Sequence, residues 1–110
     1  MQELQVNKEN CFSVLMAVYK KEQPLFFKEA LRSVFEQSLI PNEVVLVKDG
    51  PLTEELEQII VDFSSKNEQL KVITLEKNQG LGEALRIGLN SCSFDLVARM
   101  DSDDICKPYR

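Results

Sequence analysis

Short apolar runs alternate with helical patterns along the whole chain. Four runs rich in β-branched residues are bounded by polar or turn residues, and they predict strands over residues 11–19, 43–48, 70–75 and 95–100. Between them, apolar residues recur at the i, i+3, i+4, i+7 spacing of one buried helix face. The predicted buried positions are Leu25, Ala30, Leu31, Val34 and Phe35 in the first helix, Leu56, Ile59, Ile60 and Phe63 in the second, and Leu81, Ala84, Leu85 and Leu89 in the third. Thr53 before two glutamates predicts where the second helix begins, because a hydroxyl cap and early acids both satisfy exposed N–H groups.

This alternating order predicts an α/β fold with a Rossmann-like parallel sheet of about four strands, flanked by helices and buried on both faces. In such sheets ligands bind beyond the carboxyl ends of the strands, where the winding reverses. If strands two and three wind one way from strand one and strand four returns to the other side, the crevice lies between strands one and four.

Polar residues follow each predicted strand and would meet at one edge of the sheet. Tyr19 could stack on a flat ligand or cap the core. Asp49 could accept the N–H groups of a uracil or guanine base, although Asp-Gly-Pro is also a strong turn signal. Asn78 and Gly80 are most simply the turn before the third helix.

Three carboxylates stand after the last strand. On an extended chain, Asp101 and Asp103 would face one side with their Cα atoms about 6 to 7 Å apart. Oxygen ligands without histidine or paired cysteines suit Mg²⁺ or Mn²⁺. Such a metal would neutralise a nucleotide diphosphate at the crevice, whereas the same residues taken alone also describe an acidic turn.

Composition narrows the class of protein. The 110 residues are 44% hydrophobic, with a net charge of -5 and no dense Lys/Arg block, which argues against a nucleic-acid partner. Three separated cysteines offer no disulfide framework and favour a reducing cytosol. The run at 11–19 is too short for a membrane span. We expect an N-terminal extension over residues 1–10 and one domain over residues 11–110.

Five segments in order resemble one known family. They are SVLMAVY at 13–19, ALRSV at 30–34 with Gln37-Ser38, VVLVKDG at 44–50, Asn78 to Gly82, and ARMDSDD at 98–104. Together they are similar to the N-terminal, nucleotide-sugar-binding half of the inverting family 2 glycosyltransferases of the GT-A fold. The sequence around Asp49 and around Asp101 is most similar to that of bacterial enzymes that build exopolysaccharide, capsule or lipopolysaccharide O-chains.

The resemblance implies a role for each matching residue. Donor binding falls to Ala17, Tyr19, Asp49, Asn78, Gly80 and Asp101, with Asp49 at the base. Asp101-Ser102-Asp103 matches the D-x-D element: Asp103 is implied as the metal ligand, Asp101 acts at the ribose, diphosphate and metal, and Asp104 could share the metal. Lys48 departs from the family, which commonly has a second acid there.

The resemblance also implies an activity. The whole protein would transfer a sugar from a nucleotide-diphospho-sugar, in the first place a UDP-sugar, to a polysaccharide or lipid-linked acceptor, in the cytoplasm or at the inner face of the membrane. The general base is expected beyond Arg110. These residues would then carry only the donor and metal site, be inactive alone, and self-associate through the edge of strand four.

Three other classes of protein share features with this pattern. A phosphoacceptor signalling domain needs acids right after strand one, where Tyr19 and Lys20 stand. A nucleotidyltransferase generally carries a Gly-rich basic loop there, which is absent. A non-catalytic sugar-nucleotide-binding module remains the alternative to a transferase.

Overall fold

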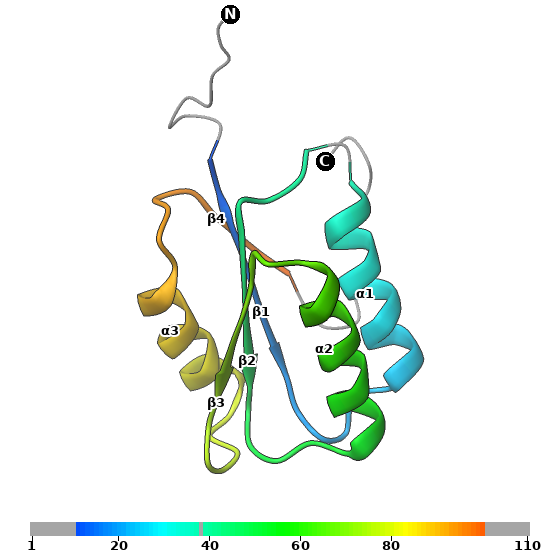
Figure 1. The fold of residues 1–110 in the computed structure, drawn as a ribbon. Coiled ribbons are helices and arrows are strands. Elements are labelled where there is room, and N and C mark those ends of the chain that lie inside the picture. The colour runs from blue at the N-terminus through cyan, green and yellow to red at the C-terminus, as the bar shows by residue number, and fades with distance from the viewer. Residues whose placement is uncertain (1–10, 38, 101–110) are drawn as a thin grey trace, which may run out of the picture.

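The computed structural model describes residues 11–37 and 39–100. Four parallel strands form one sheet in the order β3-β2-β1-β4, with helices on both faces (Figure 1). The elements in chain order are β1 Ser13–Val18, α1 Pro24–Glu36, β2 Glu43–Lys48, α2 Glu54–Lys66, β3 Leu70–Thr74, α3 Leu81–Ser91 and β4 Val97–Arg99. The predicted α/β class, the strand and helix order and the Thr53 cap are therefore confirmed, the Thr53 Oγ1 accepting from the Leu56 N–H at 3.3 Å.

The winding of the sheet reverses at β1. Strand β2 pairs with one edge of β1 over its full length, from Ser13 opposite Glu43 to Val18 opposite Lys48. Strand β4 pairs with the other edge, Ser13 lying opposite Val97. The reversal that the sequence predicts is therefore present, and it lies between β1 and β4.

Alternating side chains divide the core into two layers. Helices α1 and α2 cover one face of the sheet and α3 covers the other (Figure 1). Because successive strand residues point to opposite faces, Val14, Met16 and Val18 pack with the α1–α2 side, whereas Leu15 and Ala17 pack toward α3. The core on the α3 side contains fewer buried residues, because one helix covers that face in the described part of the chain.

The sequence predicts a sheet that is buried on both faces, and the structure shows this only for the two central strands, β1 and β2. Every residue of β1 is buried, but in β3 only Leu70 is buried, and β4 has no buried residue. β3 and β4 form the edges of the described sheet, where the helices cover less of each strand, although Leu70 of β3 still packs with Leu56 and Ile60 of α2.

Three leucines expected in the core are exposed instead: Leu25 by 64%, Leu81 by 52% and Leu89 by 52%. Leu25 precedes the buried Phe27 by two residues, about 200° around the helix, so it faces away from the core. Helix α3 contacts the sheet through the small residues Ala84 and Gly88. A helix that approaches through small residues buries a narrow stripe, which leaves the flanking leucines outside.

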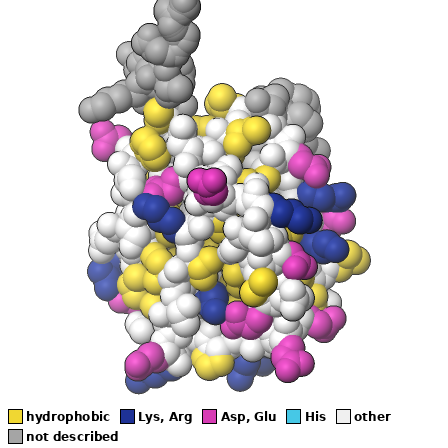
Figure 2. Space-filling view, in the orientation of Figure 1, with side chains coloured by type: hydrophobic (Ala, Val, Ile, Leu, Met, Phe, Trp, Pro, Cys, Tyr) yellow, Lys and Arg dark blue, Asp and Glu magenta, His cyan; other side chains and the backbone are white. Residues whose placement is uncertain are grey.

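Charged side chains of both signs are interspersed over the face of the molecule seen in Figure 2, with hydrophobic side chains visible between them. No single-sign field dominates that face. No helix in the described part of the chain is both long enough and apolar enough to cross a bilayer.

Candidate functional site

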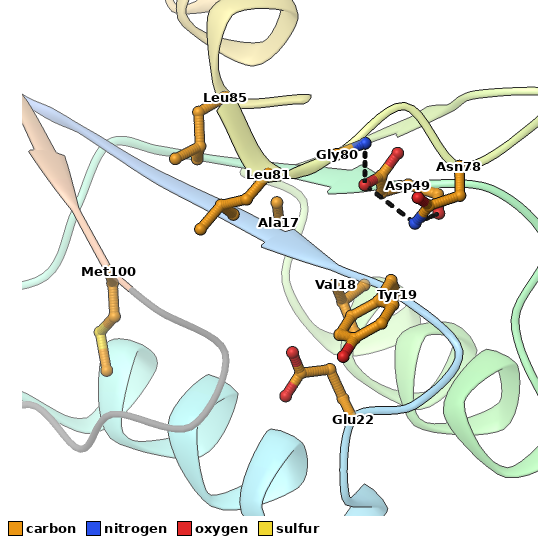
Figure 3. Close-up of a pocket in the computed structure, with 10 residues that line it drawn as sticks. All are labelled: Ala17, Val18, Tyr19, Glu22, Asp49, Asn78, Gly80, Leu81, Leu85 and Met100. Atoms are coloured by element: carbon orange, nitrogen blue, oxygen red, sulfur yellow. Dashed lines mark hydrogen bonds between the residues drawn. The ribbon is translucent and has the colours of Figure 1, made fainter. Parts of the chain in front are cut away.

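A cavity of about 420 Å³ opens at the carboxyl ends of the strands, where the winding reverses (Figure 3). Its walls come from the ends of β1, β2 and β4, from the loop before α3 and from the first turns of α3. The lining residues are Ala17, Val18, Tyr19, Glu22, Asp49, Asn78, Gly80, Leu81, Leu85 and Met100. This is the position at which open α/β sheets bind ligands.

The carboxylate of Asp49 ties the end of β2 to the start of α3. Asp49 is 5% exposed. Its Oδ1 accepts from the Gln79 N–H at 2.7 Å, and its Oδ2 accepts from the Gly80 N–H at 3.1 Å and from Asn78 Nδ2 at 3.2 Å (Figure 3). Because the N–H groups at a helix N-terminus favour negative charge, the carboxylate is well placed there. Among the described residues Oδ1 accepts this one hydrogen bond, which leaves one of its lone pairs unused.

Gly50 makes this close approach sterically feasible. Its φ is +92°, and a Cβ at this position would lie 2.6 Å from the backbone nitrogen of Asn78. Only glycine avoids both the left-handed strain and this clash. The loop after β2 and the loop before α3 therefore form one packed unit.

Tyr19 and Glu22 belong to one turn after β1. The Glu22 N–H donates to the Tyr19 carbonyl at 3.1 Å, just before α1 begins at Pro24. Tyr19 is 39% exposed, so it does not cap the core, and its ring lies at the cavity wall with its hydroxyl end toward the Glu22 carboxylate (Figure 3). A ring so placed is available for stacking.

Lys48, the departure from the family pattern, does not reach the cavity. Its side chain turns to the α2 face of the sheet, where Nζ donates to Glu57 Oε1 at 2.8 Å. The lysine therefore adds no positive charge to the cavity lining.

Five predicted donor residues, Ala17, Tyr19, Asp49, Asn78 and Gly80, are brought together at this cavity. Gly80 is also the N-cap of α3, as the turn interpretation expected. Asp101, Asp103 and Asp104 lie outside the described residues, which stop at Met100 on the cavity wall. Within the described ranges, no three Asp, Glu, Cys or His side chains are grouped closely enough to hold a metal ion.

Sequence reasoning missed five lining residues: Val18, Glu22, Leu81, Leu85 and Met100. Their helical spacing predicts that Leu81 and Leu85 lie in the core, but Leu81 is exposed and both residues border the cavity. Glu22 carried no such signal, because a single glutamate in the charged turn after β1 resembles a solvated residue.

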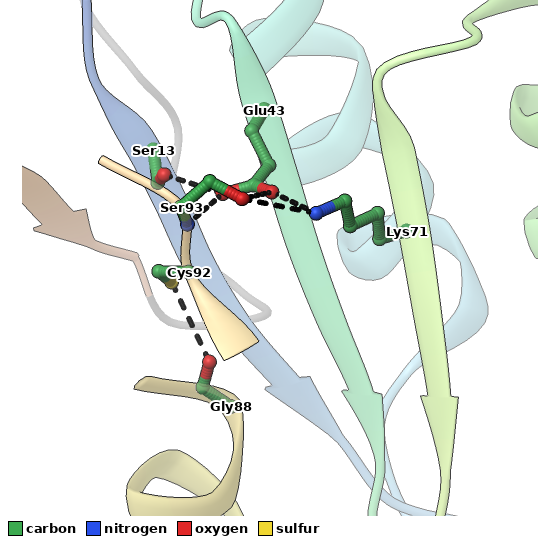
Figure 4. A network of polar contacts seen from close by, with 6 residues as sticks. All are labelled: Ser13, Glu43, Lys71, Gly88, Cys92 and Ser93. Atoms are coloured by element: carbon green, nitrogen blue, oxygen red, sulfur yellow. Dashed lines mark hydrogen bonds and ion pairs between the residues drawn. The ribbon is translucent and has the colours of Figure 1, made fainter. Parts of the chain in front are cut away.

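A second polar cluster, the Glu43 network, lies at the opposite end of the sheet (Figure 4). Glu43 is 3% exposed and accepts from Ser13 Oγ at 2.6 Å, from Ser93 N–H at 2.7 Å and from Ser93 Oγ at 2.9 Å, and it pairs with Lys71. Burial raises the pKa of Glu43, but the hydrogen bonds from Lys71, Ser13 and Ser93 outweigh it and lower the pKa to about 2. This network anchors the segment between α3 and β4, far from the cavity.

Comparison with known proteins shows which sequences and structures this chain is similar to. The family model for Glycosyl transferase family 2 matches residues 13–110. Over 99 residues, 90% of this chain, the sequence is 50% identical to a UDP-Gal:alpha-D-GlcNAc-diphosphoundecaprenol beta-1,3-galactosyltransferase of Escherichia coli. It is 46% identical, over the same share, to the amylovoran biosynthesis glycosyltransferase AmsE of Erwinia amylovora. The chain spans only 36% and 37% of the length of these two relatives.

Solved structures show the same fold. The crystal structure of S. aureus TarS 1-349 in complex with UDP superposes with a TM-score of 0.76 at 32% identity, covering 89% of this chain and 29% of that one. The mannosyltransferase PcManGT from Pyrobaculum calidifontis, solved with GDP-Man and Mn²⁺, superposes with a TM-score of 0.73 at 20% identity, covering 86% of this chain and 28% of that one, and supports the fold alone.

Proposed function

Because the chain belongs to glycosyl transferase family 2, we propose that it provides the donor site of an enzyme that transfers a sugar from a nucleoside-diphosphate sugar to a saccharide acceptor. The observation that carries this proposal is the cavity at the winding reversal. It combines an exposed aromatic ring, Tyr19, with a buried carboxylate, Asp49, that keeps one acceptor position open. A flat base and its N–H group need these two features.

The first donor to test is UDP-galactose. The Escherichia coli relative, 50% identical, is named for transfer from UDP-Gal, and the TarS structure, 32% identical, was solved with UDP. Uracil offers one N3–H donor, which matches the single lone pair left on Asp49 Oδ1. The name of the same relative specifies an acceptor on diphosphoundecaprenol, so the proposed acceptor is lipid-linked and is met at the inner face of the membrane.

The diphosphate of the proposed donor needs a cation to balance its charge. Among the described residues, the cavity lining includes two carboxylates, Glu22 and Asp49, and neither lysine nor arginine. A diphosphate there would meet like charge unless a metal accompanied it. Asp101, Asp103 and Asp104 follow β4 in the sequence, and their oxygens suit Mn²⁺ or Mg²⁺. The metal would neutralise the diphosphate leaving group.

The chain's own residues would act by binding and orientation. Asp49 fixes the base, Tyr19 covers one of its faces, and the Asn78–Gly80 loop holds Asp49 in place. The sugar would then extend past Met100 toward the carboxylates that follow β4. The acceptor hydroxyl would attack the sugar's C1 as the nucleoside diphosphate leaves. We expect the base that takes the hydroxyl proton to lie beyond Arg110.

Isothermal titration calorimetry tests the donor site. UDP and UDP-galactose should bind in the presence of Mn²⁺ and bind much more weakly with excess chelator, and GDP-mannose should bind less well than UDP-galactose. Equal affinity with and without chelator would contradict the metal, and no binding of any nucleoside diphosphate would contradict the function. Donor binding by the whole protein without transfer to any saccharide would favour a non-catalytic binding module.

A further inference from the structure

Residues 20–28, which we call the α1 tip, expose apolar side chains between lysines. They comprise the turn after β1 and the beginning of α1. Leu25 and Phe26 are 64% and 56% exposed, whereas Phe27 directly after them is fully buried. The lysines of the tip, all exposed, are Lys20, Lys21 and Lys28. Within residues 11–37 and 39–100 their side chains form no hydrogen bond or ion pair. The described fold therefore leaves both the apolar and the charged groups of the tip available for another contact.

The charge of the α1 tip is opposite to that of the chain as a whole, whose net charge is -5. Its one acid, Glu22, is half-buried and lines the cavity, so the outer surface of the tip is positive (Figure 3). The other described loops at this end of the sheet lead to acids, because α2 carries Glu54, Glu55 and Glu57 in its first turn and α3 carries Glu83. Positive charge beside exposed apolar groups is therefore a local property of the α1 tip.

The α1 tip and the cavity lie at the same end of the sheet. Strands β1, β2 and β3 run toward that end, and α1 begins there (Figure 1). Under the proposed function, on which this inference rests, the acceptor is lipid-linked and must bring its saccharide to the cavity. The bilayer then faces this end of the molecule. Of the described surface at this end, the α1 tip has the composition to contact a bilayer.

We propose that the α1 tip docks the protein on an anionic membrane surface. Leu25 and Phe26 enter the boundary between headgroups and acyl chains, and the three lysines contact lipid phosphates. The acids elsewhere on the molecule do not prevent this contact, because charges are screened beyond about 8 Å at physiological salt. Two apolar side chains and a few lysines give weak, reversible binding. Such binding suits an enzyme that must move from one lipid-linked acceptor to the next.

Charge favours a membrane over a second copy of the chain as the partner of this surface. In a two-fold dimer the same patch lies on both subunits, so a contact between two α1 tips would bring their lysines together. Like charges at such a contact are destabilising. An anionic bilayer instead supplies the opposite charge and an apolar layer at the same place.

Vesicle co-sedimentation tests the docking. The vesicles are phosphatidylethanolamine with one quarter phosphatidylglycerol, or phosphatidylcholine alone, at low and at high salt. The wild-type protein is compared with Phe26→Ser and Lys21→Gln. The matched controls are Leu89→Ser and Lys66→Gln, because both residues are exposed near the ends of α3 and α2, at the opposite end of the sheet. Thermal unfolding checks that each variant is folded, and calorimetry with UDP measures donor binding separately.

We expect the wild-type protein to bind the anionic vesicles, and to bind more weakly at high salt and to phosphatidylcholine. Phe26→Ser should weaken the binding roughly tenfold and Lys21→Gln about fivefold, whereas both controls should bind as the wild type does. No binding of the wild-type protein, or equal losses in tip and control variants, would overturn the inference. A dimer that Phe26→Ser dissociates in sedimentation without vesicles would also overturn it, because the tip would then be an interface between copies. UDP affinity should be the same in every variant, and failure of the wild-type protein to bind UDP would overturn the proposed function instead.

Discussion

Replacing Asp49 by alanine is predicted to destabilise the fold as well as the site. The substitution removes the acceptor for two backbone N–H groups, those of Gln79 and Gly80, whereas Asn78 Nδ2 keeps its second acceptor, the Asp49 carbonyl oxygen. A buried donor left without a partner costs about 1 to 3 kcal/mol. These hydrogen bonds are only part-buried and Gln79 is an exposed residue, so water satisfies part of this loss, and we expect the free energy of unfolding to fall by about 1 to 3 kcal/mol.

Urea unfolding followed by circular dichroism measures this loss, since the chain has no tryptophan to report by fluorescence. Asp95→Ala is the matched control, because Asp95 is an exposed aspartate outside the cavity lining, and its loss should change stability by less than about 0.5 kcal/mol. If Asp49→Ala unfolded at the same urea concentration as Asp95→Ala, the hydrogen-bonded loop would not be what holds this end of the sheet.

Asp49→Asn separates loop positioning from base recognition. An amide retains one oxygen acceptor but turns an NH₂ donor toward its other partners, and that donor suits the N3 acceptor of cytosine better than the N3–H of uracil. If Asp49 contacts the base, the preference for UDP over CDP should shrink in this variant. Equal weakening of both nucleotides would show that Asp49 acts through the loop alone.

Three further outcomes are expected. The fold lowers the pKa of Glu43 from 4.5 to about 2, so the stabilisation by its ionised carboxylate is complete above pH 4.5 and is lost as the pH falls toward 2. Between these pH values the free energy of unfolding should therefore fall by roughly 3 kcal/mol less in Glu43→Gln than in the wild type. Gly88→Ala should lower the melting temperature, because its Cβ would lie 2.5 Å from Leu15 Cδ1 in the packed core, whereas Gly82→Ala, on the same helix with nothing within 4 Å, should leave it unchanged or raise it. Asp103→Ala should abolish the Mn²⁺ enhancement of UDP binding seen by calorimetry, and an enhancement equal to the wild type would exclude Asp103 as a metal ligand.

The fold could be predicted from sequence because its information is local and periodic. Runs such as 43–48 are continuous and apolar, as central parallel strands require, and the reversal at β1 follows from the order of elements. The exposed leucines could not be predicted, because periodicity identifies an apolar stripe but not how closely a helix approaches its sheet. In α3 the small residues Ala84 and Gly88 set that approach and leave Leu81 and Leu89 outside.

Part of the site could be predicted, because polar residues that follow parallel strands meet at one edge of the sheet. Tyr19 and Asp49 follow from the strand ends, Ala17 is implied by the family resemblance, and all three line the cavity. The three hydrogen bonds of the Asp49 carboxylate link residues about 30 positions apart in the sequence. They could not be predicted, because no local sequence pattern indicates them. Glu22 was missed for a related reason, because a single glutamate in a charged turn resembles a solvated one until the cavity is seen.

The central claim is that this cavity binds a nucleoside diphosphate, and amide chemical shifts recorded during a titration with UDP and Mg²⁺ test it most directly. The account predicts the largest changes in chemical shift at the amides of Tyr19, Glu22, Gln79 and Gly80. The chemical shift of the Ser93 amide, in the Glu43 network at the other end of the sheet, should not change. Changes centred on that opposite end, or none at millimolar UDP, would contradict it.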